Sequence, residues 1–159
     1  MTIETVNQVL DSTLDTVDYV ESMAFEVAQR AGFRGDSLNE ISLAVHETTA
    51  NAVIHGNQYS PQKKILVAIS ASEAGLKITI ADEGDGFDAE ALPDPIAAQE
   101  LLQDHGRGVY LSRTFMDEYH VHARDTGGTE VTLIKYCRPR ESIVRHGLIP
   151  YSSQRERFI

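Results

Sequence analysis

Two early segments of the chain carry apolar residues at the spacing of an amphipathic helix. In the first, from Val17 to Ala31, apolar residues recur every three or four positions, and Gly32 follows as a stop signal. The second begins at Ser37, which forms a capping-box pattern with Glu40 three residues later. We expect this helix to run until Gly56, with a core-facing stripe that consists of Leu38, Ile41, Val45, Thr48 and Ala52.

The later part of the chain alternates between apolar and polar positions, which is the period of β-strands. The alternation and the turn residues between the runs predict four strands and two hairpin turns: strands at 65–69, 76–80, 119–123 and 130–135, turns at 72–75 and 125–128. A third helix is expected over residues 108–116. Early helices, later antiparallel strands and a returning helix predict an α+β fold: a two-layer α/β sandwich whose mixed, mostly antiparallel sheet has helices on one face.

The segment from Phe87 to His105 follows neither period. It contains Pro93 and Pro95, and it ends just before a glycine-rich triplet at residues 106–108. A connection of this length inside a compact domain is either functional or disordered. Because it lies between two glycine-rich motifs, we expect it to form a lid.

Length and composition indicate one domain with a distinct tail. The chain has 159 residues, and its hydrophobic fraction of 42% is enough for one core without disulfides or structural metals. We expect the domain to span residues 1–137 and a basic tail, with five Arg and two acidic residues, to span 138–159. The lone Cys137 favours a reducing compartment, and no apolar run reaches membrane-spanning length. We therefore expect a cytoplasmic protein that does not contact a membrane.

The overall charge argues against nucleic acid as a direct partner. With 24 acidic and 14 basic residues, the formal net charge is -10 at pH 7, which disfavours contact with a phosphate backbone. A single nucleotide is still compatible with this charge, because backbone amides and a metal ion at a local site can outweigh the global field.

The second predicted helix carries a polar strip beside its apolar stripe. Glu47 and Asn51 are four residues apart and share a face, and His55 lies one further turn along. A carboxylate can take up a proton or orient an attacking group, and an amide oxygen is a hard ligand suited to Mg²⁺. Two solvated polar residues would give the same spacing, so the strip alone does not identify a site.

A second polar motif, Asp-Glu-Gly-Asp-Gly at residues 82–86, directly follows a predicted strand. Gly84 and Gly86 would let the backbone approach a ligand closely. The Asp82 carboxylate can accept a hydrogen bond from the exocyclic amine of adenine, whereas guanine offers a carbonyl at the corresponding edge. An ordinary acidic turn is the competing interpretation. A calcium-binding loop fits poorly, because Pro93 occupies the twelfth position, where an acidic ligand belongs.

Two further glycine-rich turns complete the set of motifs. Gly106-Arg107-Gly108 opens the third predicted helix, where backbone amides and the helix dipole would meet phosphate oxygens and Arg107 would add a charge. This is not a P-loop, because no Gly-Lys-Ser/Thr follows. The turn at 127–129 is either an ordinary tight turn or a means to bring the Thr129 hydroxyl near the base of a nucleotide.

In this order the four motifs resemble the N box, the G1 box, the G2 box and the final Gly-Thr of the Bergerat ATP-binding fold, which defines the GHKL superfamily. Within it, the chain is most similar to the bacterial anti-sigma factor serine/threonine kinases of the stress-response and sporulation type, over roughly Thr16 to Lys135. His55-Gly56 and the run Phe-Met-Asp-Glu at 115–118 are typical of that branch. Each motif is modest alone, but the ordered set is specific.

The resemblance implies a role for individual residues. It assigns Glu47 as the general base, Asn51 to Mg²⁺ and the phosphates, and Asp82 to the adenine amine. The other nucleotide-binding residues that it implies are His55, Gly84, Gly86, Gly106, Arg107, Gly108, Val109 and Thr129. Val109 is a conservative departure, since Leu is more usual after the second glycine. The implied cofactors are ATP and Mg²⁺.

The resemblance also implies partners: an anti-sigma-factor antagonist as the protein substrate, a sigma factor that the kinase sequesters, and a second copy of the chain in a homodimer. Three other functions stay open. A binding module without catalysis is disfavoured by Glu47, because a pure switch needs no base. The catalytic half of a histidine kinase would need a dimerisation hairpin, for which the segment before Val17 is too short. Machinery of the gyrase type would need further domains.

Overall fold

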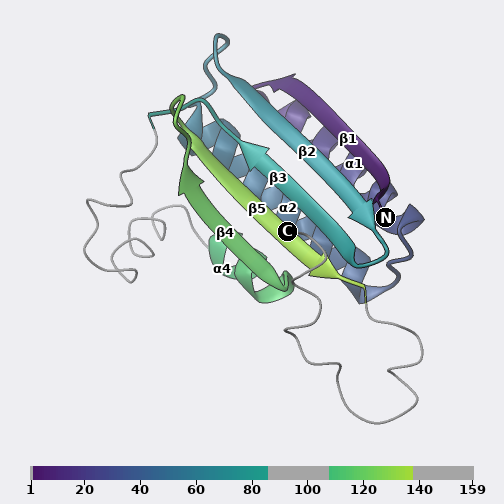
Figure 1. Ribbon diagram of the computed structural model, residues 1–159. Helices are drawn as coiled ribbons and strands as arrows, with labels where there is room; N and C mark the ends of the chain where they lie inside the picture. The colour runs from purple at the N-terminus through teal and green to yellow at the C-terminus, as the bar shows by residue number, and fades with distance from the viewer. Residues whose placement is uncertain (1, 86–107, 138–159) are drawn as a thin grey trace, which may run out of the picture.

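The computed structural model describes residues 2–85 and 108–137, which form a five-stranded sheet with helices on one face (Figure 1). The elements are β1 (Thr2–Asp11), α1 (Leu14–Arg30), α2 (Asp36–Asn51), the π-helical turn η1 (Ala52–Gly56), β2 (Lys64–Ser72), β3 (Gly75–Ala81), α4 (Gly108–Phe115), β4 (Glu118–Ala123) and β5 (Thr129–Tyr136). The strand order is β1-β2-β3-β5-β4, and each described pair is antiparallel. The predicted two-layer α+β fold is confirmed.

The core lies between the helical layer and the sheet. One face of each long helix is buried, as the apolar periodicity predicted, and β2 alternates between partly exposed and buried positions along its length. Ile65, Val67 and Ile69 are therefore directed into the core from β2, and they meet the buried stripes of α1 and α2. This burial is the main favourable contribution to folding, at about 25 cal/mol for each Å² of apolar surface removed from water.

The start of α2 differs from its prediction. The helix begins at Asp36 after Gly35, whose φ of 57° is a left-handed value that glycine adopts readily, and no side chain caps the first turn. The amides of Leu38 and Asn39 bond instead to the carbonyl of Gly35. The capping box predicted for Ser37 and Glu40 is therefore wrong, because the preceding glycine already turns the chain into the helix.

Strand β1 was not predicted, because it alternates weakly and forms the edge of the sheet. Its core-facing side chains include Gln8 between Val6 and Leu10, and all three are only half-buried. The strand is held by its backbone hydrogen bonds to β2, and its own sequence does not predict this pairing. An exposed bidentate ion pair, with Arg30 at the end of α1 donating to Glu4 at 2.7 and 3.0 Å, adds a link to the helical layer.

Several expectations fall on residues outside the described part of the chain. These are the lid over 87–105, the site residues Gly86, Gly106 and Arg107, and the basic tail over 138–159. Within the described ranges, no helix combines the length and the apolar character needed to cross a bilayer.

Candidate functional site

Asp82 forms the centre of a buried corner directly after β3. The residue is only 6% exposed, and its Oδ1 accepts hydrogen bonds from the backbone N–H groups of Gly84 at 3.0 Å and Thr129 at 3.2 Å. Its backbone N–H donates to the carbonyl of Thr129 at 2.9 Å, so the corner is joined to the start of β5. Among the described residues, Oδ2 has no hydrogen-bond partner, which leaves one oxygen of a fixed carboxylate able to accept a donor from a ligand.

The electrostatics of the corner also favour such a donor. Burial raises the pKa of Asp82 above its usual value, while the N–H groups of Gly84 and Thr129 and the positive charges of Arg124 and Lys63 act in the opposite direction. The net shift is upward, so the ionised carboxylate lacks part of the solvation that it would have in water. A hydrogen bond donated to Oδ2 would replace some of that solvation.

Three glycines pack so closely around Asp82 that no side chain would fit. A Cβ on Gly56 would lie 2.4 Å from Asp82 Oδ2, and one on Gly128 would lie 2.0 Å from the Asp82 carbonyl oxygen. A Cβ on Gly84 would lie 2.1 Å from the carbonyl oxygen of Gly56. The ends of three of the four sequence motifs therefore meet at one carboxylate. Thr129 takes part through its backbone N–H.

Asn57 anchors this corner to the rest of the fold, and sequence reasoning missed it. The residue is 1% exposed, and its Nδ2 donates to Ser12 Oγ at 2.8 Å and to the Lys64 carbonyl at 2.9 Å. Its Oδ1 accepts the backbone N–H of Glu83 at 2.8 Å. The Asn57 amide thus joins the turn after Asp82 to the start of β2 and to the segment between β1 and α1. Its position after Gly56 resembles an ordinary turn, and its partners are distant in sequence.

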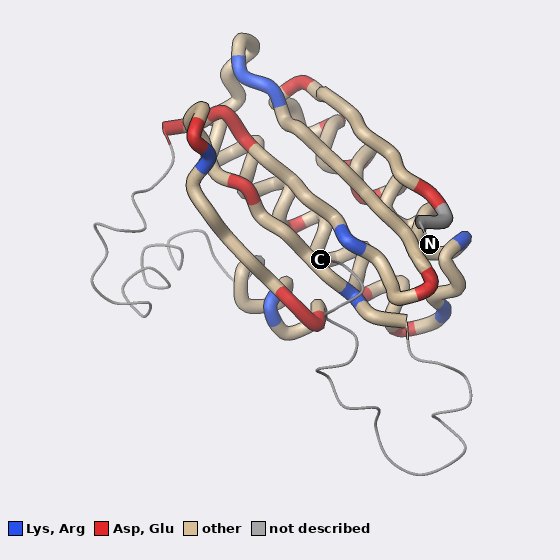
Figure 2. The backbone as a smooth tube through the Cα atoms, viewed as in Figure 1, with Lys and Arg blue, Asp and Glu red and all other residues tan. Residues whose placement is uncertain are grey.

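Arg124 is a second residue of the corner that sequence reasoning missed. Its Nη1 donates to the Asp82 carbonyl at 2.8 Å and to the Gly127 carbonyl at 3.2 Å. The guanidinium therefore ties the turn between β4 and β5 to the end of β3. Basic and acidic segments of the backbone lie close together at this end of the sheet (Figure 2). A lone Arg before a turn carries no signal that could have predicted these contacts.

The polar strip on α2 is more open than the Asp82 corner. Glu47 and Asn51 are partly exposed, and neither side chain has a hydrogen-bond partner among the described residues, whereas His55 is exposed. The predicted core stripe beside them is buried, as expected. The carboxylate and the amide therefore keep their acceptor atoms available to a ligand.

The π-helical turn η1 connects the strip to the corner. Here the N–H of Asn57 donates to the carbonyl of Ala52 at 2.8 Å, one residue further back than in an α-helix, so one extra residue is inserted before the helix ends. Gly56 closes this turn and lies against Asp82. From Gly56 back along the axis, a rise of 1.5 Å per residue places Asn51 at roughly 7 Å and Glu47 at roughly 14 Å.

Helix α4 lies beside α2 and is held there by polar contacts. Ser112 donates to the Ala44 carbonyl at 3.3 Å, and the ammonium of Lys135 donates to Glu40 at 2.9 Å and to the carbonyl of Phe115, the last residue of α4. A cation at a helix C-terminus is favourable. Val109, in the first turn, is buried. The amino end of α4, which begins at the predicted site residue Gly108, is therefore fixed relative to the strip.

The residues of the site fit a purine nucleotide with a bound divalent ion. Asp82 offers a buried acceptor of fixed orientation at a corner where three glycines pack closely. Asn51 offers an amide oxygen of the kind that hard cations accept. Glu47 offers a carboxylate further along the same helix, where it could take up a proton.

Comparison with known proteins finds a matching family and named relatives. The family described as "Histidine kinase-like ATPase domain" matches residues 10–135. A protein named "Anti-sigma F factor" from Bacillus cytotoxicus is 33% identical over 103 residues, which cover 64% of this chain and 70% of the relative. "Serine-protein kinase RsbW" from Bacillus subtilis (strain 168) is 31% identical over 116 residues, which cover 69% and 71%.

A solved structure agrees at the level of the fold. The RsbU and RsbW domains of a Mycobacterium tuberculosis protein align with 86% of this chain at a TM-score of 0.60 and 20% sequence identity. The aligned part spans 33% of that longer chain. At this identity the likeness supports the architecture alone.

Proposed function

This chain belongs to the histidine kinase-like ATPase domain family, and from that premise we propose that it is an ATP-dependent serine/threonine protein kinase that acts as an anti-sigma factor. Its protein substrate is an antagonist of the anti-sigma factor, and its second partner is a sigma factor. The names of two relatives support the proposal: an anti-sigma F factor supports the role as an anti-sigma factor, and a serine-protein kinase supports the kinase activity. A homodimer and a cytoplasmic location stay predictions.

The observation that carries the proposal is the Asp82 carboxylate. It is buried, its Oδ1 is occupied by two backbone N–H groups, and its Oδ2 has no partner among the described residues. The exocyclic amine of adenine supplies the missing donor. Guanine presents a carbonyl there, and two acceptors facing each other in a buried site would be unfavourable. The corner therefore favours ATP over GTP.

The α2 strip supplies the groups for the phosphate end. From the Asp82 corner, a nucleotide that extends along α2 reaches Asn51 first and Glu47 about one turn later. Asn51 offers its amide oxygen to Mg²⁺, and the ion supplies neutralisation of the phosphate charge. Glu47 accepts the proton of the attacking serine hydroxyl, which is the role of a general base in phosphoryl transfer.

The direct test uses the purified chain, γ-labelled ATP and candidate antagonist proteins encoded by neighbouring genes. We expect label on a serine of one antagonist with the wild-type chain, and loss of that label with Glu47→Ala. Glu73→Ala, which changes an exposed carboxylate in the β2–β3 turn, serves as the matched control. ATP binding without transfer to any antagonist would favour the non-catalytic binding module instead.

A further inference from the structure

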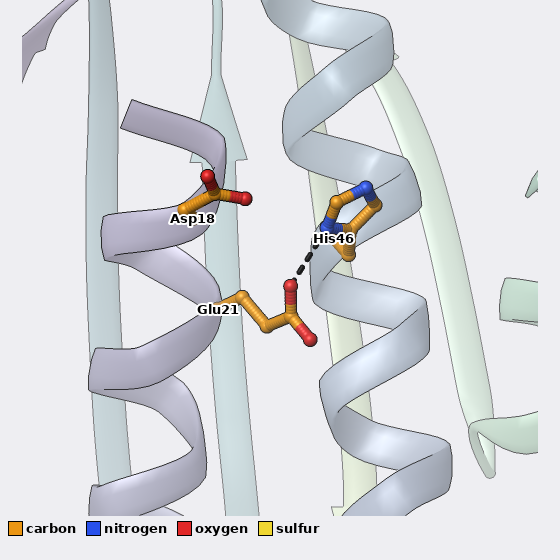
Figure 3. A group of neighbouring side chains, drawn as sticks. All are labelled: Asp18, Glu21 and His46. Atoms are coloured by element: carbon orange, nitrogen blue, oxygen red, sulfur yellow. Dashed lines mark hydrogen bonds and ion pairs between the residues drawn. The ribbon is translucent and has the colours of Figure 1, made fainter. Parts of the chain in front are cut away.

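A second group of metal-ligating side chains lies outside the nucleotide site, between α1 and α2. Asp18 and Glu21 are three residues apart on α1 and share a face, and His46 faces them from α2 (Figure 3). One donor atom of each residue lies within 4.8 Å of the donors of the other two. His46 Nδ1 is 2.7 Å from Glu21 Oε2. Two consecutive helices thus bring three donors together.

The backbone beneath the cluster is fixed by the core. Val17 and Val20 on α1 and Val45 on α2 are buried next to the cluster residues in sequence, so the two helices cannot easily separate at this level. Ser42 on α2 donates to Glu21 Oε1 at 2.8 Å and orients that carboxylate, as the outer partners of metal ligands commonly do. The side chains of Glu21 and His46 are 34% and 38% exposed, so an ion can reach them from solvent.

The chemistry of the donors selects a class of ion. One imidazole nitrogen with two carboxylate oxygens suits Zn²⁺ and its first-row neighbours, whereas Mg²⁺ and Ca²⁺ prefer oxygen alone. Three protein ligands also leave one position of a tetrahedral ion for water. Ligands about 2.1 Å from such an ion are roughly 3.4 Å apart, so the observed spacing requires only side-chain rotation to bind it.

The cluster differs from the other histidine–carboxylate pairs of the described chain. On β4, His120 pairs with Glu118 at 3.1 Å and His122 with Glu130 at 2.9 Å, and neither pair has a third ligating side chain close enough to complete a set among the described residues. The third ligand, Asp18, separates the α1–α2 cluster from these pairs.

We propose that Asp18, Glu21 and His46 form a binding site for a divalent first-row transition cation, Zn²⁺ foremost, that joins α1 to α2. On binding, the ion takes the place of the hydrogen between His46 Nδ1 and Glu21 Oε2. The metal-bound imidazole is neutral with its proton on Nε2, and any further proton is released to solvent. His46 directly precedes Glu47 in sequence, so the ion would be held by the helix that carries the catalytic strip. The proposal rests on these three side chains and does not depend on the kinase assignment.

The test is a calorimetric titration of the full chain with ZnCl₂. Nucleotide is left out of the titration, because a nucleotide itself binds zinc. We expect the wild-type chain to bind Zn²⁺, and His46→Gln and Asp18→Asn each to weaken that site at least about tenfold. His122→Gln is the matched control, since it removes one imidazole from a two-membered pair. Wild-type affinity in both cluster variants, loss of the site in His122→Gln, or no Zn²⁺ binding by the wild type would overturn the proposal.

Thermal unfolding provides a second readout, because loss of the stabilisation in a cluster variant would locate the ion at the cluster. An ion held between α1 and α2 binds the folded chain, so Zn²⁺ should raise the Tm of the wild type and of His122→Gln but not that of His46→Gln. Circular dichroism of each variant without metal verifies that the fold is intact. An equal rise of Tm in His46→Gln would contradict the site, and either outcome leaves the phosphotransfer test unaffected.

Discussion

The Asp82 corner and the α2 strip would hold opposite ends of one nucleotide, yet they are built in different ways. At the corner, Asp82 and Asn57 are buried, and their side chains are held by backbone groups from three parts of the chain and by the Ser12 hydroxyl. On the strip, Glu47 and Asn51 are partly exposed and make no side-chain hydrogen bonds within the described ranges. The corner is organised by the fold, whereas the strip would be organised by its ligand.

The difference separates two kinds of residue in a binding site. A residue of the corner contributes to both stability and affinity, because its partners belong to the protein. A residue of the strip should contribute mainly to binding or catalysis, because truncating Glu47 or Asn51 removes no side-chain hydrogen bond within the described chain. Substitutions in the two regions should therefore divide cleanly between variants that keep their stability and variants that change it.

Asn51→Ala should have the largest effect on nucleotide binding. No neighbouring amide can replace the ligand for Mg²⁺, so we expect binding of Mg-ATP to be abolished in calorimetry while the Tm stays within a degree or so of wild type. Asn39→Ala, at an exposed position on the same helix, is the control. Wild-type affinity in Asn51→Ala would remove this residue from the site.

Glu47→Ala should bind ATP about as well as the wild type and still lose phosphotransfer. The expected loss is on the order of 100-fold or more, the usual range for a general base. The measurement is the initial rate of transfer to the antagonist at saturating ATP, together with the Tm, which should not change. Transfer within a few-fold of wild type would rule out Glu47 as the base.

Asp82→Asn should weaken ATP binding without lowering the stability of the fold. The amide can place a donor opposite the adenine amine, and an unpaired buried polar group costs about 1–3 kcal/mol, so ATP should bind roughly tenfold to a hundredfold more weakly. At pH 7 the variant should be no less stable than the wild type, because it removes a buried charge while Oδ1 can still accept both N–H groups.

The raised pKa of Asp82 determines how the difference in stability between Asp82→Asn and the wild type changes with pH. The folded-state pKa of Asp82 is raised, so the folded chain holds the proton more tightly than the unfolded chain does. The destabilisation from the buried charge is present above the folded-state pKa and disappears as the pH falls through it. Any stability advantage of Asp82→Asn, measured by denaturant unfolding, should therefore shrink toward acidic pH. An advantage that grows as the pH falls would contradict the upward shift.

Asn57→Ala should have the smallest effect on ATP and a clear effect on stability. It leaves the Glu83 N–H and the Lys64 carbonyl without their buried partner, at a cost of about 1–3 kcal/mol in the free energy of unfolding. We expect only a few-fold weaker ATP binding, through a looser turn after Asp82. Asn7→Ala on exposed β1 is the control, and an unchanged stability of Asn57→Ala would show that the corner is not held in this way.

Features that follow from a local pattern could be predicted from the sequence, whereas features that depend on distant partners could not. Helices α1, α2 and α4 and strands β2 to β5 have strong local periods, and the strip on α2 follows from helical spacing within one element. Gly35, β1 and Asn57 could not be identified in this way. The glycine cap replaces a plausible capping box, the edge strand depends on pairing with β2, and the Asn57 network joins residues up to 45 positions apart.

Calorimetry of the wild-type chain with Mg-ATP and Mg-GTP tests most directly whether the fold builds the Asp82 corner to accept adenine. Guanine would place a carbonyl against the buried carboxylate, so ATP should bind about tenfold to a hundredfold more tightly than GTP. Equal affinity for the two nucleotides would contradict the account.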